Sequence, residues 1–217
     1  PRIPASSTFA AKRCLTVCWK SNRWGSETSV DMPITKIVSG GQTGVDQAGL
    51  EAAIYCKIPH GGWCPKGRKS EDGRIPDKYS LQETSTADYL TRTEANVVDS
   101  DATLIITPSR PSRGSLRTIE FCMKHGKPWH HVSLEATSQK QAVEEVTLWL
   151  SGDPEMNDYE DYEACPPKEC VLNVAGTRGS KLTVHENVII NLLLEVIWKA
   201  GGKMFYPLGG PNGMTID

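Results

Sequence analysis

The chain has 217 residues and a formal net charge of −2, so it is long enough for one domain with a substantial core. The charge gives no support to general nucleic-acid binding, and no apolar run approaches the roughly 18 residues that span a membrane. We therefore expect neither nucleic acids nor membranes as partners.

Seven cysteines are scattered along the chain without a Cys-x-x-Cys pair. Free thiols in a reducing compartment explain an odd, scattered set best, which favours a cytoplasmic location. Cys64 and His60 could bind a metal, but a buried cysteine is the simpler interpretation, and no structural metal is expected.

Residues 1–31 are basic, with no acidic residue before Glu27, a bias that organelle-targeting segments share. A peripheral N-terminal extension is our interpretation, and organelle targeting is the alternative. We expect a single domain over residues 32–202 and a tail over residues 203–217.

The stretch from residue 35 to residue 53 indicates an anion site. Ile37 and Val38 predict a short buried strand, the following glycines predict a turn, and small side chains at helical spacing predict a helix after Gly44. A helix start directs unpaired N–H groups at an anion, and the stretch lacks both the dinucleotide fingerprint and a Walker A lysine. We predict phosphate binding by backbone, with these candidates: Gly40, Gly41, Gln42, Thr43, Gly44 and Asp46. Thr43 and Asp46 fit a helix-capping box equally well.

Residues 58–65 predict a short strand interrupted by Gly and Pro, and a charged loop follows over residues 66–73. Lys66 and Arg68 in this loop could close over the phosphates of a ligand, with a solvated surface turn as the alternative. A helix is predicted to open at residues 85–88 and to run to Val98.

Residues 102–107 are a continuous apolar run, typical of a buried strand in a parallel sheet. The next segment carries small and basic residues into a helix whose start favours an anion. Its candidate site residues are Ser112, Arg113, Gly114, Ser115, Thr118 and Glu120. Glu120 stabilises the helix dipole in the plainer interpretation and is the candidate general acid–base if it faces a cleft.

Two more strands are predicted around residues 127–132 and 171–175, with a helix over residues 137–150 and an acidic loop over residues 153–163 between them. His130 and His131 are adjacent on a strand, so they point to opposite faces and do not easily share a metal. The loop after the last strand adds Gly176, Arg178, Ser180 and Lys181 as anion-binding candidates.

The final predicted helix covers residues 187–199, from Asn187 to Lys199, and is apolar almost all round. One face would cover the sheet, and the surplus apolar surface predicts a subunit contact. We therefore expect a homo-oligomer with this helix in the interface.

The alternation of strands and helices predicts an α/β fold with a parallel sheet and helices on both faces. Ligands of such sheets bind beyond the carboxyl ends of the strands. The loops after Val38, Thr107 and Ala175 should meet at that edge. Three anion-binding loops at one edge favour a nucleotide or a phosphorylated heterocycle as ligand.

Several segments resemble the molybdenum cofactor carrier family, a circularly permuted YpsA-like branch of the SLOG superfamily. They are residues 36–46, 58–67, 71–73, 87–94, 99–101, 118–121 and 172–176. The resemblance covers about residues 33–199 and implies a Rossmann-like fold related to the Lonely Guy phosphoribohydrolases. The chain departs from the family pattern where Arg113, Gly114 and Ser115 replace Gly-Gly-Thr, and where Thr177 and Gly179 replace Pro and Glu.

An algal member of this family binds and protects the molybdenum cofactor, a pterin that carries a phosphate. The resemblance favours a non-enzymatic carrier of a phosphorylated ligand, with the molybdenum cofactor (molybdopterin) as the named candidate. The alternatives are a Lonely Guy-like N-glycosidase that uses Glu120 and an arginine, or a nucleotide-sensing SLOG protein. Only a Gly-x-x-x-Thr-x-Glu remnant of the hydrolase loop, from Gly114 to Glu120, is present, which weakens the enzyme alternative.

Overall fold

A computed structural model of the chain describes residues 34–151, 166 and 169–201. The predictions for residues 1–31, 153–163 and 203–217 lie outside this described part.

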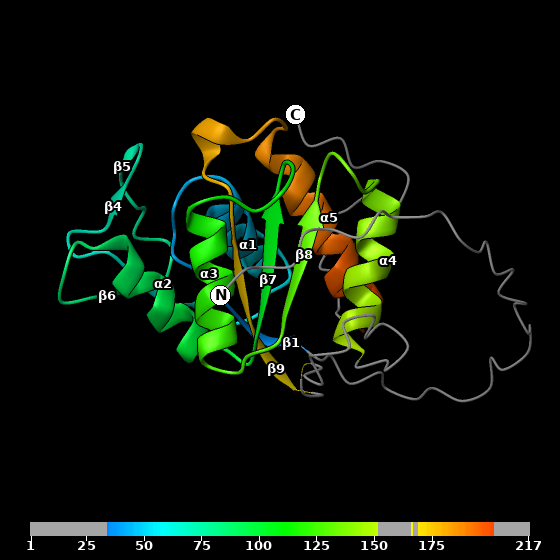
Figure 1. Cartoon of the computed structure of the whole chain (residues 1–217), viewed down its shortest axis with the longest axis horizontal. Coiled ribbons are helices and arrows are strands. Elements are labelled where there is room, and N and C mark those ends of the chain that lie inside the picture. Colours follow the sequence, from blue (N-terminus) through cyan, green and yellow to red (C-terminus); the bar gives the residue numbers. More distant parts are fainter. Residues whose placement is uncertain (1–33, 152–165, 167–168, 202–217) are drawn as a thin grey trace, which may run out of the picture.

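A five-stranded parallel sheet stands at the centre of the molecule (Figure 1), with strand order β2-β1-β9-β7-β8. The strands are β1 (Ile34–Val38), β2 (His60–Gly61), β7 (Ala102–Thr107), β8 (Trp129–Ser133) and β9 (Cys170–Gly176). Every residue of β7 is buried, because helices cover both faces of the sheet. The predicted α/β fold is confirmed.

The crossover connections place the helices in two layers. The chain moves outward in opposite directions from β1 to β2 and from β7 to β8, and right-handed crossovers then place the connecting helices on opposite faces. On one face, α1 (Val45–Tyr55) and α4 (Gln139–Leu150) both contact α5 (Glu186–Lys199). On the other face, α2 (Tyr89–Val98) packs against α3 (Gly114–Lys124). Among the described helices, none has the length and apolar character needed to cross a membrane.

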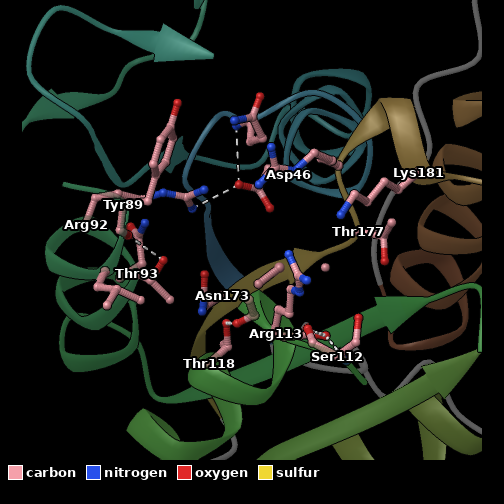
Figure 2. Close-up of a pocket in the computed structure, with 18 residues that line it drawn as sticks. Asp46, Tyr89, Arg92, Thr93, Ser112, Arg113, Thr118, Asn173, Thr177 and Lys181 are labelled. Carbon is pink, nitrogen blue, oxygen red and sulfur yellow. Dashed lines mark hydrogen bonds and ion pairs between the residues drawn. The ribbon is translucent and has the colours of Figure 1, made fainter. Parts of the chain in front are cut away.

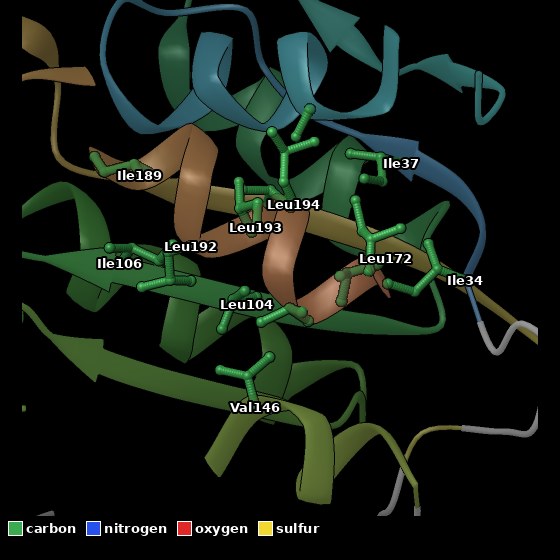
Figure 3. Packing of buried hydrophobic residues seen from close by; sticks show 14 of the residues in the cluster. Ile34, Ile37, Leu104, Ile106, Val146, Leu172, Ile189, Leu192, Leu193 and Leu194 are labelled. Atoms are coloured by element: carbon green, nitrogen blue, oxygen red, sulfur yellow. The ribbon is translucent and has the colours of Figure 1, made fainter. Parts of the chain in front are cut away.

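The main core lies between the sheet and the layer of α1, α5 and α4. Figure 3 shows side chains of α5 pointing into this core together with strand residues. The fully buried members of greatest volume are Ile34, Ile37, Leu104, Ile106, Leu172, Ile189, Leu192, Leu193 and Ile197.

Helix α5 is apolar almost all round, and other helices of the same chain cover most of its surface. It packs on α1 along one side and on α4 along the other, and its exposed large apolar residues are Val188 and Trp198. The surplus apolar surface therefore needs no subunit contact, and that basis for the predicted interface was wrong. The homo-oligomer itself stays a prediction, which light scattering would test.

Residues between β2 and α2 form a small outlying unit. Strand β3 (Trp63–Cys64) pairs in parallel with β6 (Gln82–Glu83), and β4 (Lys69–Ser70) pairs with β5 (Gly73–Arg74). Its buried residues Cys64, Ile75, Tyr79 and Leu81 form an apolar cluster with Leu50 of α1. The single strand predicted over residues 58–65 is thus two short strands in different sheets.

Strand β8 contains a histidine whose burial makes stability depend on pH. His130 stacks on Trp149 of α4 with ring centroids 5.5 Å apart, and its buried Nε2 has no hydrogen-bond partner among the described residues. Burial, with a contribution from His131, lowers the pKa of His130 from 6.5 to about 4.

On acidification, a histidine whose pKa is lowered in the folded protein is protonated first in the unfolded chain. Acidification from the unfolded pKa near 6.5 to the folded pKa of about 4 should therefore remove up to about 3 kcal/mol of the free energy of unfolding. We expect His130→Phe, which keeps the stacking, to lose less stability over this interval. Urea unfolding at stepped pH measures this, and parallel pH profiles for the two proteins would contradict it.

Candidate functional site

A cavity of about 360 Å³ opens at the carboxyl ends of the central strands, within the size range of small-molecule sites. Figure 2 shows its lining side chains converging from the loops after β1, β7 and β9 and from α2. The lining residues are Gln42, Asp46, Tyr89, Leu90, Arg92, Thr93, Asn96, Ser112, Arg113, Gly114, Ser115, Thr118, Asn173, Ala175, Gly176, Thr177, Arg178 and Lys181.

The start of α3 forms one wall of the cavity. Its N-cap residue, Arg113, has a φ of 37° and makes no side-chain cap. A Cβ atom added to Gly114 would have no neighbour within 4 Å, so the backbone there borders open space. The Ser115 hydroxyl is engaged with Ser112, whose N–H donates to it at 2.9 Å. This helix start can therefore present N–H groups and an arginine to an anion.

The loop after β9 forms another wall and adds Arg178 and Lys181 to the cavity lining. Arg178 lies 3.9 Å from a Glu71 carboxylate oxygen. Arg113 and Lys181 have no carboxylate within ion-pair distance among the described residues. The cavity thus carries positive charge that other described side chains do not neutralise.

The glycine loop after β1 is largely filled by the protein itself. The Val45 N–H at the start of α1 donates to the Thr177 carbonyl at 3.2 Å, and the N-cap Gly44 has a φ of 82°. A Cβ atom on Gly44 would lie 2.6 Å from the Gly179 nitrogen. The start of α1 therefore packs against the β9 loop, and its first N–H is not free for a ligand.

We predicted that the glycines of this loop let a ligand come close to the backbone. In the structure, other side chains of the protein occupy the space beside them. A Cβ atom on Gly40 would lie 1.5 Å from Arg92 Nη1, and one on Gly41 would lie 2.5 Å from Leu81 Cδ1. Of the six candidates in this loop, only Gln42 and Asp46 line the cavity. Gly40, Gly41, Thr43 and Gly44 do not.

Asp46 forms an internal ion pair with Arg92, at 3.0 Å, with side chains 5% and 12% exposed. The Gln42 N–H also donates to its carboxylate at 3.3 Å. Burial raises the pKa of Asp46, and the charge of Arg92 opposes that rise. The capping-box alternative was wrong, because the N-cap of α1 is Gly44 instead of Thr43 and no side chain caps this helix start.

Arg68 and Lys66 lie outside the cavity lining. The buried guanidinium of Arg68 donates to four backbone carbonyls, those of Ile75, Pro76, Tyr79 and Leu81, at 2.8–3.2 Å. Arg68 therefore organises the outlying unit, while Lys66 is exposed at its surface. A role for either residue in closing over a ligand stays a prediction.

Glu120 and Ser180 also lie outside the cavity lining. The Glu120 carboxylate pairs with Arg117 at 2.5 Å, with side chains 57% and 59% exposed, so Glu120 does not face the cleft. Ser180 donates its hydroxyl to Glu71 at 2.6 Å. The sequence candidates that the structure does bring together are Gln42, Asp46, Ser112, Arg113, Gly114, Ser115, Thr118, Gly176, Arg178 and Lys181.

Helix α2 supplies lining residues that we did not predict: Tyr89, Leu90, Arg92, Thr93 and Asn96. Asn96 is a structural member, since it accepts from the Trp63 N–H at 2.7 Å and donates to the Trp63 carbonyl at 3.0 Å. The available signal was the family-like segment over residues 87–94. Asn173 in β9, which donates to Thr103 at 3.2 Å, also lines the cavity and was not predicted.

No group of three or more His, Cys, Asp or Glu side chains in the described ranges is arranged to hold a metal ion. Cys64 is buried, and burial raises the pKa of its thiol. Of the described residues that line the cavity, none is Cys or His.

Comparison with known proteins places these features in a family. The profile of the circularly permutated YpsA SLOG family matches residues 37–197. A putative molybdenum carrier protein from Syntrophus aciditrophicus SB, known from a crystal structure, is 42% identical in sequence to this chain. The two structures superpose with a TM-score of 0.62. That likeness covers 76% of this chain and 95% of the other. A comparison with curated proteins gave no match.

Proposed function

The chain belongs to the circularly permutated YpsA SLOG family, and we propose that it binds and carries a phosphorylated small molecule, with the molybdenum cofactor as the candidate ligand. The observation that carries this proposal is the cavity between the α3 start and the β9 loop. Both Arg113, at the α3 start, and Lys181, in the loop after β9, line it. A dianionic phosphate between them would gain charge-assisted hydrogen bonds.

The chemistry of the lining supports a ligand held by its phosphate and its ring. The described lining has no thiol or imidazole to coordinate molybdenum, so a pterin cofactor would be bound through its organic part. Tyr89 and Leu90 offer apolar surface for a ring, and Gln42 and Asn173 offer amide groups. The solved relative, described as a putative molybdenum carrier protein, supports this choice among phosphorylated heterocycles.

No specific observation favours the N-glycosidase alternative. The carboxylate that it requires, Glu120, pairs with Arg117 at the surface, and the lining carboxylate, Asp46, is engaged with Arg92. Incubation with nucleoside monophosphates should release no free base. Mass spectrometry of the ligand that copurifies with the protein should identify a phosphorylated heterocycle.

We expect Arg113→Ala and Lys181→Ala each to weaken binding of adenosine monophosphate, used as a probe, about 10- to 100-fold. Each substitution removes one hydrogen bond to a charged group, which contributes about 1.5–3 kcal/mol. Isothermal titration measures the affinity. The matched control is Arg117→Ala, on the same helix as Gly114 but paired with Glu120 outside the cavity. Equal affinities for all four proteins would rule out the cavity as the phosphate site.

A further inference from the structure

Glu71, which does not line the cavity, joins the loops that surround it. The residue belongs to the outlying unit, between β4 and β5. Its N–H donates to the Gln42 side-chain oxygen at 2.9 Å, which ties it to the loop after β1. Its carboxylate, 15% exposed, faces the loop after β9.

Both carboxylate oxygens of Glu71 accept hydrogen bonds. Oε1 accepts from the Thr43 hydroxyl and from the Ser180 N–H, the latter at 2.9 Å. Oε2 accepts from the Ser180 hydroxyl at 2.6 Å and lies 3.9 Å from Arg178 Nε. Burial by itself would raise the pKa of Glu71, but the hydrogen bonds from Ser180 and Thr43 outweigh it, and the pKa lies below 4.5. The side chain is thus a carboxylate at neutral pH.

The loop over residues 177–181 is held in part by these bonds. It contains a single 3-10 turn (Gly179–Lys181) with no buried residue and no side-chain cap. Its other ties to the β1 loop are the Val45 N–H bond to Thr177 and the Gly179 N–H bonds to Thr43. Glu71 therefore holds Ser180, which lies between the two cations of the loop, Arg178 and Lys181.

We propose that Glu71 is a positioning residue of the ligand site, whose carboxylate anchors Ser180 so that Arg178 and Lys181 face the cavity. The assignment rests on the proposed function for its ligand, but the anchoring can be measured without one. Glu71 does not line the cavity, so it would not contact a phosphate bound there. A negative charge there serves the site only through the loop that it holds.

Hydrogen exchange on the ligand-free protein tests the anchoring. In Glu71→Ala, the amide of Ser180 loses its acceptor, and we expect this amide to exchange at least about tenfold faster while amides of β7 keep their rates. Ser180→Ala removes the hydroxyl bond from the other side and should weaken protection of the same loop less. Unchanged exchange at Ser180 in Glu71→Ala would overturn the proposal, whether or not a ligand binds.

A double-mutant cycle tests the consequence for binding, with adenosine monophosphate as the probe. Glu71→Ala should weaken binding about tenfold in the otherwise unchanged protein, but by less than about threefold in the Lys181→Ala background, because a cation that it positions is then absent. Equal factors in both backgrounds would overturn a role through the loop. Failure of the unchanged protein to bind the probe would count against the proposed function, and the exchange experiment would still decide the role of Glu71.

Discussion

Gly176→Ala is expected to destabilise the protein by about 3 kcal/mol or more, at the upper end of overpacking effects. Gly176 ends β9, beside β7, and a Cβ atom there would lie 2.0 Å from the Ile106 carbonyl oxygen and 2.9 Å from Val45 Cγ2. The Thr177 N–H donates to the same carbonyl at 3.1 Å, so relief would require moving two central strands apart. Stability of a domain is typically about 5–15 kcal/mol, and the substitution would remove a large share of it.

Gly114→Ala is the matched control, since Gly114 also lines the cavity but a Cβ atom added there would have no neighbour within 4 Å. Alanine at a helix start in open space should leave stability unchanged or raise it by up to about 1 kcal/mol. Urea unfolding followed by circular dichroism gives both values. A midpoint for Gly176→Ala equal to that of the unchanged protein would show that the strands tolerate the methyl group.

Arg92→Met is expected to cost about 3–5 kcal/mol at neutral pH, because it leaves the buried Asp46 carboxylate without its counter-charge. The pair is 3.0 Å apart, and Asp46 is the more buried partner. Asp46→Asn should cost less, since the 12% exposed Arg92 side chain borders the cavity and can be hydrated there. The double variant should be more stable than Arg92→Met alone.

The cost of Arg92→Met should also depend on pH. Burial already raises the pKa of Asp46 and Arg92 opposes that rise, so removing Arg92 raises the folded pKa further. A carboxyl group whose pKa is raised in the folded state makes the protein less stable as pH rises through that pKa. Acidification restores this stability. The difference from the unchanged protein should thus shrink between neutral pH and about pH 5.

Chemical unfolding of the four proteins of this cycle at both pH values measures the effect. Arg117→Ala serves as the control, because its exposed pair with Glu120 should contribute no more than about 1 kcal/mol. A loss in Arg92→Met that is independent of pH would mean that the ionised Asp46 carboxylate is not its source.

Sequence alone was sufficient for the sheet and for the edge at which the cavity opens. The apolar run over residues 102–107 coincides with β7, and the helix predicted over residues 187–199 with α5, which begins at Glu186. These features follow from periodicity, capping and glycine placement, which act over a few residues of chain. Convergence of the three loops follows from the parallel order of the strands, with β9 between β1 and β7.

Only the tertiary structure decided which groups face the cavity. The space left by Gly40 receives Arg92, and the partner of Arg92 is Asp46, 46 residues away. Glu71 binds Ser180 across 109 residues of chain, and α5 is covered by α1 and α4. A local pattern determines that a glycine leaves room or that a helix is apolar. Which distant side chain fills that room depends on how the layers pack, and that information is spread over the whole chain.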